Sequence, residues 1–380
     1  MHERVCRQRV VALGRQFPAV SILGPRQAGK STLAKLSFPD AVMYDLEDPN
    51  DLRLVSSDPL LALGRHRRVI FDEAQRLPSL FPVLRSFLDR NPDRRVVLLG
   101  SASPSLVQGI SESLTGRVGF FELGGVSVLE APAQALWLKG SFPRVHWSKP
   151  RSPPATWYPS YLKTTLEQDL PMLGFRLPSA RLHNFVSMLA HAQGGLSDLS
   201  AWGGSLGIDH KTVAHMLDVL EGVFLVRRLR PYFANLKKRL VKSPKVYLRD
   251  TGLLHSLLGT GFTEASLFRH PKAGASFETF VIEQLVTAAR YADPSSQAFF
   301  FRSQDGIEVD LLLSLRGKLI PIEVKLGLQV PAVRPLQTTM DLLGLKKGFV
   351  VSHAAQPMEV ARGIAALSLT DLLDELSLGR

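Results

Sequence analysis

Residues 24–31 constrain the fold of this chain more than any other segment. They read Gly-Pro-Arg-Gln-Ala-Gly-Lys-Ser and match the pattern G-x-x-x-x-G-K-[ST] at every fixed position. The apolar run Ala19–Leu23 before them predicts a short buried strand, and residues 31–36 predict a helix. Glycines let such a loop curl, so that its backbone N–H groups and the positive end of the helix face phosphate groups. The segment therefore predicts a nucleotide-binding α/β domain.

The residue types in this loop and at the end of a later strand indicate roles for individual side chains. We expect Lys30 to pair with the β- and γ-phosphates of ATP, and the Ser31 hydroxyl to hold Mg²⁺. The apolar strand that starts at Arg68 ends in Asp72 and Glu73. Asp72 would orient the Mg²⁺ shell, and Glu73 would polarise the attacking water as a general base. The expected nucleotide-binding residues are Gly24, Pro25, Arg26, Gln27, Ala28, Gly29, Lys30, Ser31 and Thr32.

Two further polar residues accompany later strands. The strand Arg95–Leu99 is followed by Gly100 and Ser101, and Ser101 is either a side chain that senses the γ-phosphate or part of a plain turn. Arg117 precedes a fifth strand, Gly119–Leu123. It either reaches the nucleotide of a neighbouring subunit, where it stabilises transition-state charge, or forms a surface salt bridge.

Several segments together resemble one family. GPRQAGKSTLA, VIFDEAQRLP, LLGSASPSL and SLTGRVGFFEL are similar, in this order, to the signatures of bacterial and archaeal AAA-type ATPases that usually carry a C-terminal domain of unknown function, DUF4143. Leu46–Pro49 and Lys245–Leu253 fit the same family. The resemblance implies a five-stranded AAA+ core of strand order 5-1-4-3-2. It also implies homo-oligomers, in rings or smaller assemblies, and no particular cellular function.

Positive charge is concentrated in the middle of the chain. The whole chain carries 46 Lys and Arg against 34 Asp and Glu, a net charge of +12. Residues 132–272 hold 19 basic and eight acidic side chains, whereas residues 273–380 hold ten and twelve. Nine basic residues lie between Glu221 and Asp250, with no acidic residue among them. Such a localised, uncompensated cationic stretch indicates contact with a polyanion through its phosphates.

The same region predicts a winged helix. Helical spacing of apolar residues over 181–226 is interrupted by expected turns at Gly203-Gly204 and at 207–209, and Asp209 is expected to cap a helix that runs to about Gly222. The segments Phe224–Leu229 and Val246–Leu248 would form the wing. The expected contacts to duplex or branched DNA are Lys211, Arg227, Arg228, Arg230, Lys237, Lys238, Arg239, Lys242 and Lys245. Alternatively, this part is only a lid of the ATPase, with its cations at a subunit interface.

The last third predicts a nuclease-like fold. A long helix over 276–290 precedes strands at 298–301, 309–313 and 319–324, and Asp310 followed by Glu323-Val324-Lys325 has the D…E-x-K spacing of PD-(D/E)xK nucleases. Together with Glu278, these carboxylates would bind Mg²⁺ and activate water. Lys325 would orient the nucleophile or stabilise developing charge. The domain either cleaves nucleic acid or serves only as a binding module.

The chain is thus expected to be an α/β protein with consecutive parts. They are an AAA+ P-loop ATPase core (1–138), a Pro- and Ser-rich connector (139–160), a basic helical and winged-helix domain (161–270) and a PD-(D/E)xK nuclease-like α/β domain (271–380). The single cysteine, Cys6, excludes an intramolecular disulfide and a Cys-cluster zinc site. No apolar run approaches the ~20 residues that span a bilayer, and the N-terminus lacks a signal-peptide core. We therefore expect a cytoplasmic protein without a membrane partner.

Three functions compete on these grounds. The first is an ATP-hydrolysing protein that binds duplex or branched DNA in recombination, repair or defence. The second is an ATP-gated, Mg²⁺-dependent DNA nuclease. The third is a nucleotide switch that binds a protein partner through the basic face. Stimulation of ATP turnover by DNA separates the first from the third.

Overall fold

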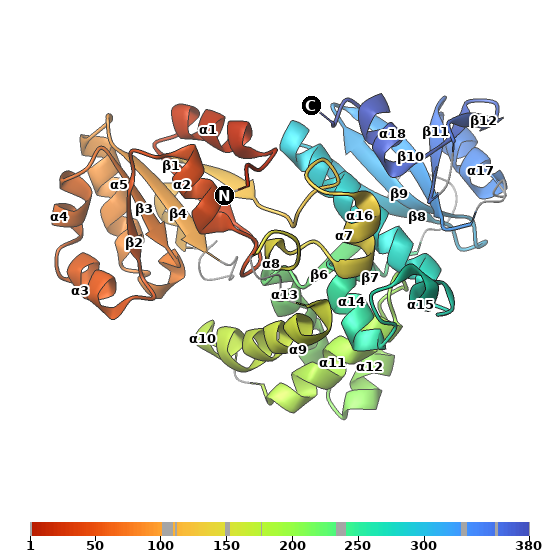
Figure 1. Cartoon of the computed structure of the whole chain (residues 1–380), viewed down its shortest axis with the longest axis horizontal. Coiled ribbons are helices and arrows are strands. Elements are labelled where there is room, and N and C mark those ends of the chain that lie inside the picture. Colours follow the sequence, from red (N-terminus) through yellow and green to blue (C-terminus); the bar gives the residue numbers. More distant parts are fainter. Residues whose placement is uncertain are drawn as a thin grey trace.

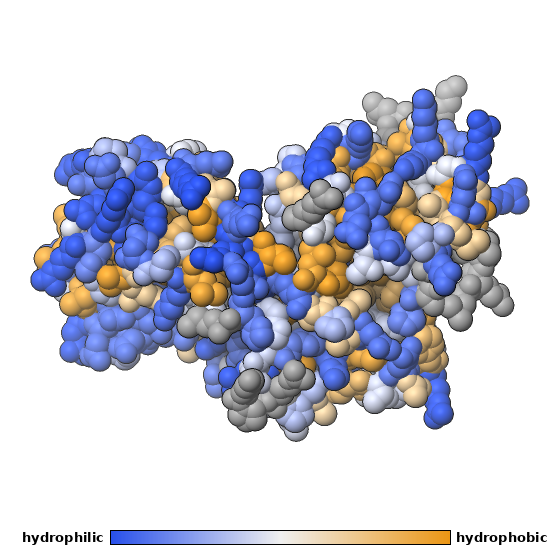
Figure 2. All heavy atoms as spheres, turned by 45° about the horizontal axis from the view of Figure 1, so that its top comes forward, coloured by the Kyte–Doolittle hydropathy of each residue, from blue (hydrophilic) through white to orange (hydrophobic). Residues whose placement is uncertain are grey.

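The computed structural model describes residues 2–100, 109–110, 112–148, 153–175, 177–232, 241–327, 333–353 and 356–379. An N-terminal α/β lobe lies beside a larger lobe, in which a helical part packs against a C-terminal α/β part (Figure 1). Hydrophilic residues cover much of the N-terminal lobe in Figure 2, and hydrophobic residues gather where the lobes meet. Within the described ranges, no helix combines the length and the apolar character needed to cross a membrane.

Five parallel strands form the N-terminal sheet, in the order β2-β3-β4-β1-β5. This order, counted from the other edge, is the predicted 5-1-4-3-2. Apolar clusters cover both faces of the sheet, and β1 is therefore buried at all five positions. The strands are β1 (Ala19–Leu23), β2 (Val42–Asp45), β3 (Arg68–Asp72), β4 (Arg95–Gly100) and β5 (Val118–Glu122). The helices are α1 (Arg7–Gln16), α2 (Lys30–Ser37), α3 (Pro49–Ser57), α4 (Pro59–Gly64), η1 (Ala74–Arg76) and α5 (Leu80–Arg90).

The helical part follows. Its elements are α7 (Ala133–Lys139), α8 (Pro143–His146), α9 (Pro154–Thr164), the π-helical turn η2 (Thr165–Asp169), α10 (Leu170–Met172), α11 (Ser179–His191), α12 (Leu199–Leu206), α13 (His210–Gly222), α14 (Thr251–Leu258) and α15 (Glu264–Phe268). α13 has the predicted bounds, because the Asp209 carboxylate accepts hydrogen bonds from the backbone N–H groups of Lys211 and Thr212. Apolar side chains of most of these helices form one continuous cluster, whereas those of α7 and α15 belong to the cluster of the C-terminal part.

Two expectations for this part are wrong. Gly203 and Gly204 form no turn and lie inside α12. A Cβ at Gly203 would lie 2.7 Å from the backbone oxygen of Ile208, so this glycine lets the following turn pack closely against the helix. The C-terminal part of the expected connector, from Pro154, is the helix α9, and its Trp157 is buried in the apolar cluster.

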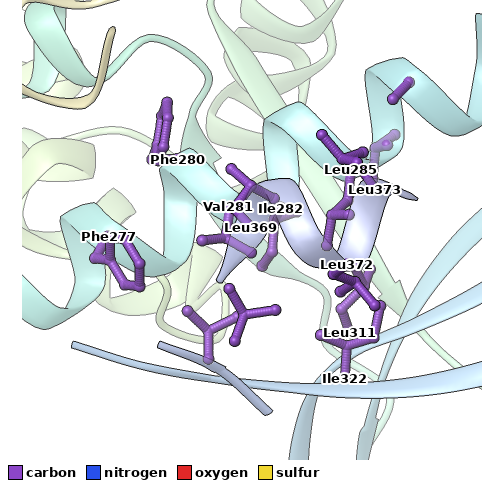
Figure 3. Packing of buried hydrophobic residues seen from close by; sticks show 14 of the residues in the cluster. Phe277, Phe280, Val281, Ile282, Leu285, Leu311, Ile322, Leu369, Leu372 and Leu373 are labelled. Carbon is purple, nitrogen blue, oxygen red and sulfur yellow. The ribbon is translucent and has the colours of Figure 1, made fainter. Parts of the chain in front are cut away.

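The C-terminal part is built on an eight-stranded mixed sheet, in the order β12-β13-β11-β10-β9-β8-β6-β7. α16 and α18 pack on one face, as Figure 3 shows for apolar residues of these helices with Leu311 and Ile322 from the strands, and α17 packs on the other. The strands are β6 (Val226–Pro231), β7 (Lys245–Leu248), β8 (Gln297–Arg302), β9 (Glu308–Leu315), β10 (Lys318–Lys325), β11 (Gly348–Ser352), β12 (Met358–Ala361) and β13 (Ile364–Leu367). The helices are α16 (Ala273–Ala292), α17 (Arg334–Leu343) and α18 (Leu369–Glu375).

The expected wing is not a separate structure. β6 and β7 pair antiparallel, as predicted for a wing, but β6 also pairs in parallel with β8 through Arg230 and Pro231. The two strands thereby become the edge of the C-terminal sheet. A segment of the basic region is in this way part of the fold of the last third of the chain.

Candidate nucleotide site and acidic pocket

The P-loop, the segment of residues 24–31 that matches the sequence motif, joins β1 to α2 and lies against the residues that follow β5. Gly29 has a φ of 94°, a left-handed conformation that glycine adopts without strain. A Cβ on Gly24 would lie 2.5 Å from the backbone oxygen of Leu123, and a side chain does not fit there. The backbone conformation at Gly29 and the close packing at Gly24 thus explain why the motif has glycine at both positions.

Lys30 begins α2, and its side chain is buried at the loop. Nζ donates to the backbone oxygens of Gly24 and Pro25 at 3.0 and 3.1 Å. Burial lowers the pKa of Lys30, and the carboxylates of Glu73 and Asp72 oppose this shift. The ammonium is held over the loop, where the phosphates of a bound nucleotide would face it.

Asp72 and Glu73 end β3 beside the loop. Ser31 Oγ donates to Asp72 Oδ2 at 2.5 Å. Burial raises the pKa of Asp72, and the hydrogen bond from Ser31 opposes the rise. A hydroxyl beside a carboxylate is an oxygen donor set that Mg²⁺ accepts, so these two residues fit the predicted ion. Glu73 has a φ of 51°, an uncommon conformation outside glycine that concentrates at functional sites.

A cavity of about 640 Å³ opens over the P-loop, within the ~300–1,000 Å³ typical of ligand sites. Lys30 lines it together with Arg144, Trp147 and Trp157, which come from the helical part. Trp147 stacks on His2, with ring centroids 4.8 Å apart. Sequence reasoning missed these lining residues, because they belong to no motif and reach the loop only through the fold.

Two arginines fasten the P-loop to its surroundings. Arg26 forms an ion pair with Asp169 in η2 and lies 3.6 Å from Glu47. Arg4 is buried, and its guanidinium donates to the backbone oxygen of Ala28 at 3.1 Å and to Gly125 at 2.6 Å. The loop is therefore connected both to the helical part and to the segment after β5.

The two polar residues predicted beside later strands have different outcomes. Ser101 lies outside the described residues. Arg117 is half-buried at the surface and forms a two-pronged ion pair with Asp89, with nitrogen–oxygen distances of 2.6 and 2.9 Å. Of its two interpretations, the surface salt bridge is present within the chain, and a role at a neighbouring subunit stays a prediction.

The expectation of an uncompensated basic stretch is wrong for four residues. Arg227 and Arg249 pair with Glu283, Arg228 pairs with Glu221, and Lys245 pairs with three carboxylates of the C-terminal part. Their acidic partners lie outside the stretch between Glu221 and Asp250, so a count of the charges within this stretch does not include them. Lys211, Arg230 and Lys242 are exposed at the surface. Lys237, Lys238 and Arg239 lie outside the described residues.

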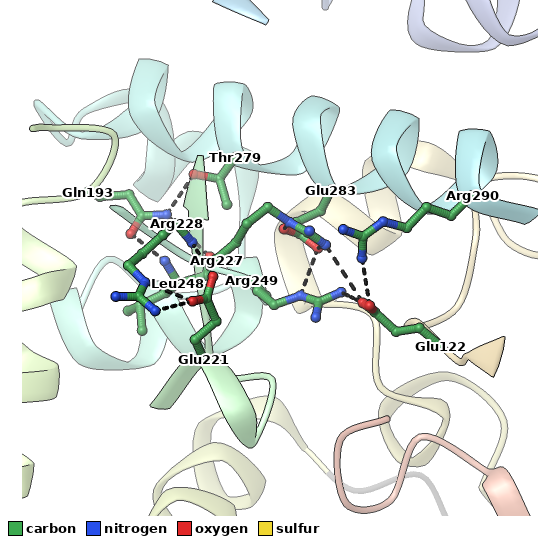
Figure 4. Close-up of polar contacts among 10 residues, drawn as sticks. All are labelled: Glu122, Gln193, Glu221, Arg227, Arg228, Leu248, Arg249, Thr279, Glu283 and Arg290. Carbon is green, nitrogen blue, oxygen red and sulfur yellow. Dashed lines mark hydrogen bonds and ion pairs between the residues drawn. The ribbon is translucent and has the colours of Figure 1, made fainter. Parts of the chain in front are cut away.

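A partly buried network of charges joins β5 to α16, with Arg249 at its centre (Figure 4). Arg249 donates to Glu122 at 2.8 Å and to Glu283 at 3.0 Å. Arg290 donates to the other oxygen of Glu122 at 2.6 Å, and Arg227 pairs with Glu283. Burial alone would raise the pKa of Glu122, but the three arginines lower it to about 2. This charge network links the ATPase sheet to the C-terminal part.

The carboxylates predicted for a nuclease site lie in one cluster of side chains, the acidic pocket, which comprises Glu278, Glu308, Asp310 and Glu323 together with Lys245. Lys245 Nζ lies 3.3 Å from Glu278 Oε1 and 3.4 Å from Asp310 Oδ1. It lies 2.6 Å from Glu308, which sequence reasoning did not assign. The backbone N–H of Val324 donates to the second oxygen of Asp310 at 2.9 Å. Lys245, an expected DNA contact, is therefore buried among the expected metal ligands.

Glu323, the fourth carboxylate of this pocket, and Lys325 complete the predicted site. Lys325 Nζ lies 2.6 Å from Glu323 Oε1, whereas Glu323 Oε2 is buried without a hydrogen-bond partner among the described residues. Burial and the charge of Asp310 raise the pKa of Glu323 to about 7, and they do the same for Glu278. In the part of the chain that the structure describes, no three His, Cys, Asp or Glu residues are grouped to hold a metal ion. These residues do not fit a divalent ion as predicted, since Lys245 contacts two of the three proposed ligands.

Three family models match successive parts of the chain. They are an AAA domain over residues 16–131, and two domains of unknown function, DUF8612 over 132–264 and DUF4143 over 273–372. The uncharacterized proteins Rv2008c of Mycobacterium tuberculosis and Mb2031c of Mycobacterium bovis are each 43% identical over 316 residues, which cover 81% of this chain and 70% of the relative. A Walker-type ATPase of Pyrococcus abyssi, PABY2304, aligns with 68% of this chain and 96% of its own, at 16% identity and a TM-score of 0.47.

Proposed function

We propose a function on the basis that this chain belongs to the same family as Rv2008c and Mb2031c and is an AAA-type ATPase with a C-terminal DUF4143 domain. We propose that it couples ATP hydrolysis at the P-loop to the binding of duplex or branched DNA. Recombination, repair or defence would use such an activity. The observation that carries the proposal is the grouping of Lys30, Ser31, Asp72 and Glu73 at the end of the parallel sheet. The carboxyl ends of parallel strands meet at this edge, where open α/β sheets bind their ligands.

Each residue of this group has a defined task. Lys30 faces the β- and γ-phosphates and offsets their negative charge. Ser31 and Asp72 would hold Mg²⁺, which would supply positive charge beside the phosphates. Glu73 polarises the attacking water and accepts its proton. Glu73 follows the strand end in a left-handed conformation, and it lines the same cavity as Lys30.

The helical part would sense the nucleotide directly. Arg144 and Trp147 line the cavity over the P-loop, and Arg26 within the loop pairs with Asp169 in η2. A ligand bound in this cavity would touch both the sheet and the helices. Loss of the γ-phosphate would therefore change the contacts between the two lobes.

The DNA contact would lie around the basic residues that the fold leaves at the surface. Arg230 and Lys242 are exposed, and in the sequence they flank residues 233–240, which contain Lys237, Lys238 and Arg239. Side chains of this kind contact phosphates and give affinity without reading base sequence. We further propose that subunits associate as homo-oligomers, with Arg117 near a subunit interface, in the cytoplasm.

ATP turnover and nucleotide binding test the first half of the proposal. Glu73→Gln should retain ATP binding and lower turnover by ~10²–10⁴-fold, as expected for loss of a general base. Lys30→Ala should lose ATP binding. Glu375→Gln, which removes an exposed carboxylate of α18, is the matched control and should behave as the unaltered protein. Unchanged turnover in Glu73→Gln would refute the role of this residue.

DNA binding is tested separately with charge-matched variants. The triple variant Lys237→Ala, Lys238→Ala, Arg239→Ala should bind a duplex and a four-way junction more weakly, and the slope of its salt dependence should fall by about one unit for each phosphate that it no longer neutralises. The control neutralises three surface lysines of the C-terminal part, Lys318, Lys346 and Lys347. ATP turnover should rise with one or more of these DNAs. Equal binding by both triple variants, with no rise in turnover, would favour a switch that binds a protein partner.

A further inference from the structure

The acidic pocket of the C-terminal part receives two side chains from β7. Lys245 and Tyr247 are two residues apart on this strand and therefore point to the same face. The Tyr247 hydroxyl donates to Glu278 Oε1 at 2.6 Å, and Lys245 Nζ lies between Glu278, Glu308 and Asp310. The strand thus inserts a cation and a hydrogen-bond donor into the pocket.

Carboxylate oxygens surround the Lys245 ammonium in the way that ligands surround a bound metal cation. Its side chain is only 3% exposed, and each of its three contacts is a carboxylate oxygen at 2.6 to 3.4 Å. An ammonium group has three N–H donors, and three acceptors therefore satisfy it completely. The ring of Phe300 covers a further side, with its centroid 5.7 Å from Nζ.

The charges of the pocket are nearly balanced without any added ion. Its four carboxylates are Glu278, Glu308, Asp310 and Glu323. Three cations face them, since Arg302 pairs with Glu308 at 2.8 Å and Lys325 with Glu323, in addition to Lys245. A divalent cation beside Lys245 would leave an excess of positive charge in a buried site, which is costly.

We infer that the Lys245 ammonium is the resident cation of this pocket and takes the position between Glu278 and Asp310 that a divalent metal ion would need. The nuclease-like arrangement of carboxylates then serves to anchor β7 to the C-terminal sheet. A second prediction follows from the same geometry. Removal of the ammonium should turn the pocket into a site for a divalent cation, because its carboxylates would be left without their partner.

Binding of Mn²⁺ to the full-length, nucleotide-free protein tests this inference. Bound Mn²⁺ is counted by electron paramagnetic resonance in two pairs of proteins, and the two members of each pair differ only by Asp310→Asn. In the first pair, the unaltered protein and Asp310→Asn should bind the same amount of Mn²⁺. In the second pair, Lys245→Met should bind one more ion per chain than Lys245→Met with Asp310→Asn. The P-loop residues are identical in all four proteins, so any weak binding there cancels.

Thermal unfolding gives a second measurement. Mn²⁺ should raise the melting temperature of Lys245→Met and not that of the unaltered protein, because a ligand stabilises the folded state that binds it. An ion bound by the unaltered protein and lost with Asp310→Asn would overturn the inference. So would the lack of any gain of Mn²⁺ in Lys245→Met. If Lys245→Met does not fold, Lys245→Gln replaces it in the second pair, and the first pair decides on its own whether the pocket takes a metal.

Discussion

Removal of Arg249 should destabilise the protein more than the loss of any single surface ion pair. Arg249 is 11% exposed and neutralises both Glu122 and Glu283 in the charge network. Breaking a buried pair costs ~3–5 kcal/mol, since the remaining charge is left buried without a partner. Glu122 keeps Arg290 and Glu283 keeps Arg227. We therefore expect Arg249→Met to lie at the lower end of the range, at about 3 kcal/mol.

Urea unfolding measures this effect, with circular dichroism and tryptophan fluorescence recorded in parallel, because a chain with several domains need not unfold in one step. Lys347→Met is the control: its partner Glu375 is exposed, and such pairs contribute ~0–1 kcal/mol. Glu283→Gln and the double variant complete a cycle, in which the double loss should be smaller than the sum of the single losses. If Arg249→Met were no more destabilising than Lys347→Met, the network would not hold the lobes together.

Two further predictions concern pH and the P-loop. The pKa of Glu122 is lowered from its ordinary 4.5 to about 2. The ionised Glu122 side chain therefore contributes its full stabilisation above pH 4.5, and this stabilisation is lost as the pH falls from there towards 2. Acid titration of Arg249→Met should show a shallower loss of stability over this pH range than the unaltered protein. Gly24→Ala places a methyl group 2.5 Å from the backbone oxygen of Leu123 and should cost ~1–3 kcal/mol and weaken ATP binding, both measurable by calorimetry. Gly64→Ala, with nothing within 4 Å of the new methyl group, should cause no loss, and an equal loss in both variants would contradict the steric explanation.

Local patterns predicted the parts of this molecule that depend on neighbouring residues. The sequence around Lys30 and Asp72 specifies a loop and a strand end, and the parallel sheet brings the two together. Asp209 could be recognised as a helix cap because its hydrogen-bond partners are two and three residues away. Such interactions are visible in any short window of sequence.

The partners of the basic residues are not visible in this way. Arg249 pairs with Glu122, which is 127 positions earlier, and Lys245 pairs with Asp310, 65 positions later. A count of charges along the chain treats both cations as free, although folding places each beside a carboxylate. Hydrophobic patterning predicted β6 as a strand, and the pairing of Arg230 with Phe299 that joins β6 to β8 depends on residues almost 70 positions apart.

The pairing of β6 with β8 also decides where this chain can be divided. A fragment of residues 273–372, the extent of the DUF4143 match, would contain β8 without its neighbour β6, and it would contain Glu278 and Asp310 without Lys245. An uncovered edge strand invites pairing with other molecules, and buried carboxylates without a cation disfavour the folded state. We therefore expect an autonomous folding unit that includes this sheet to begin at or before Val226, inside the preceding family match.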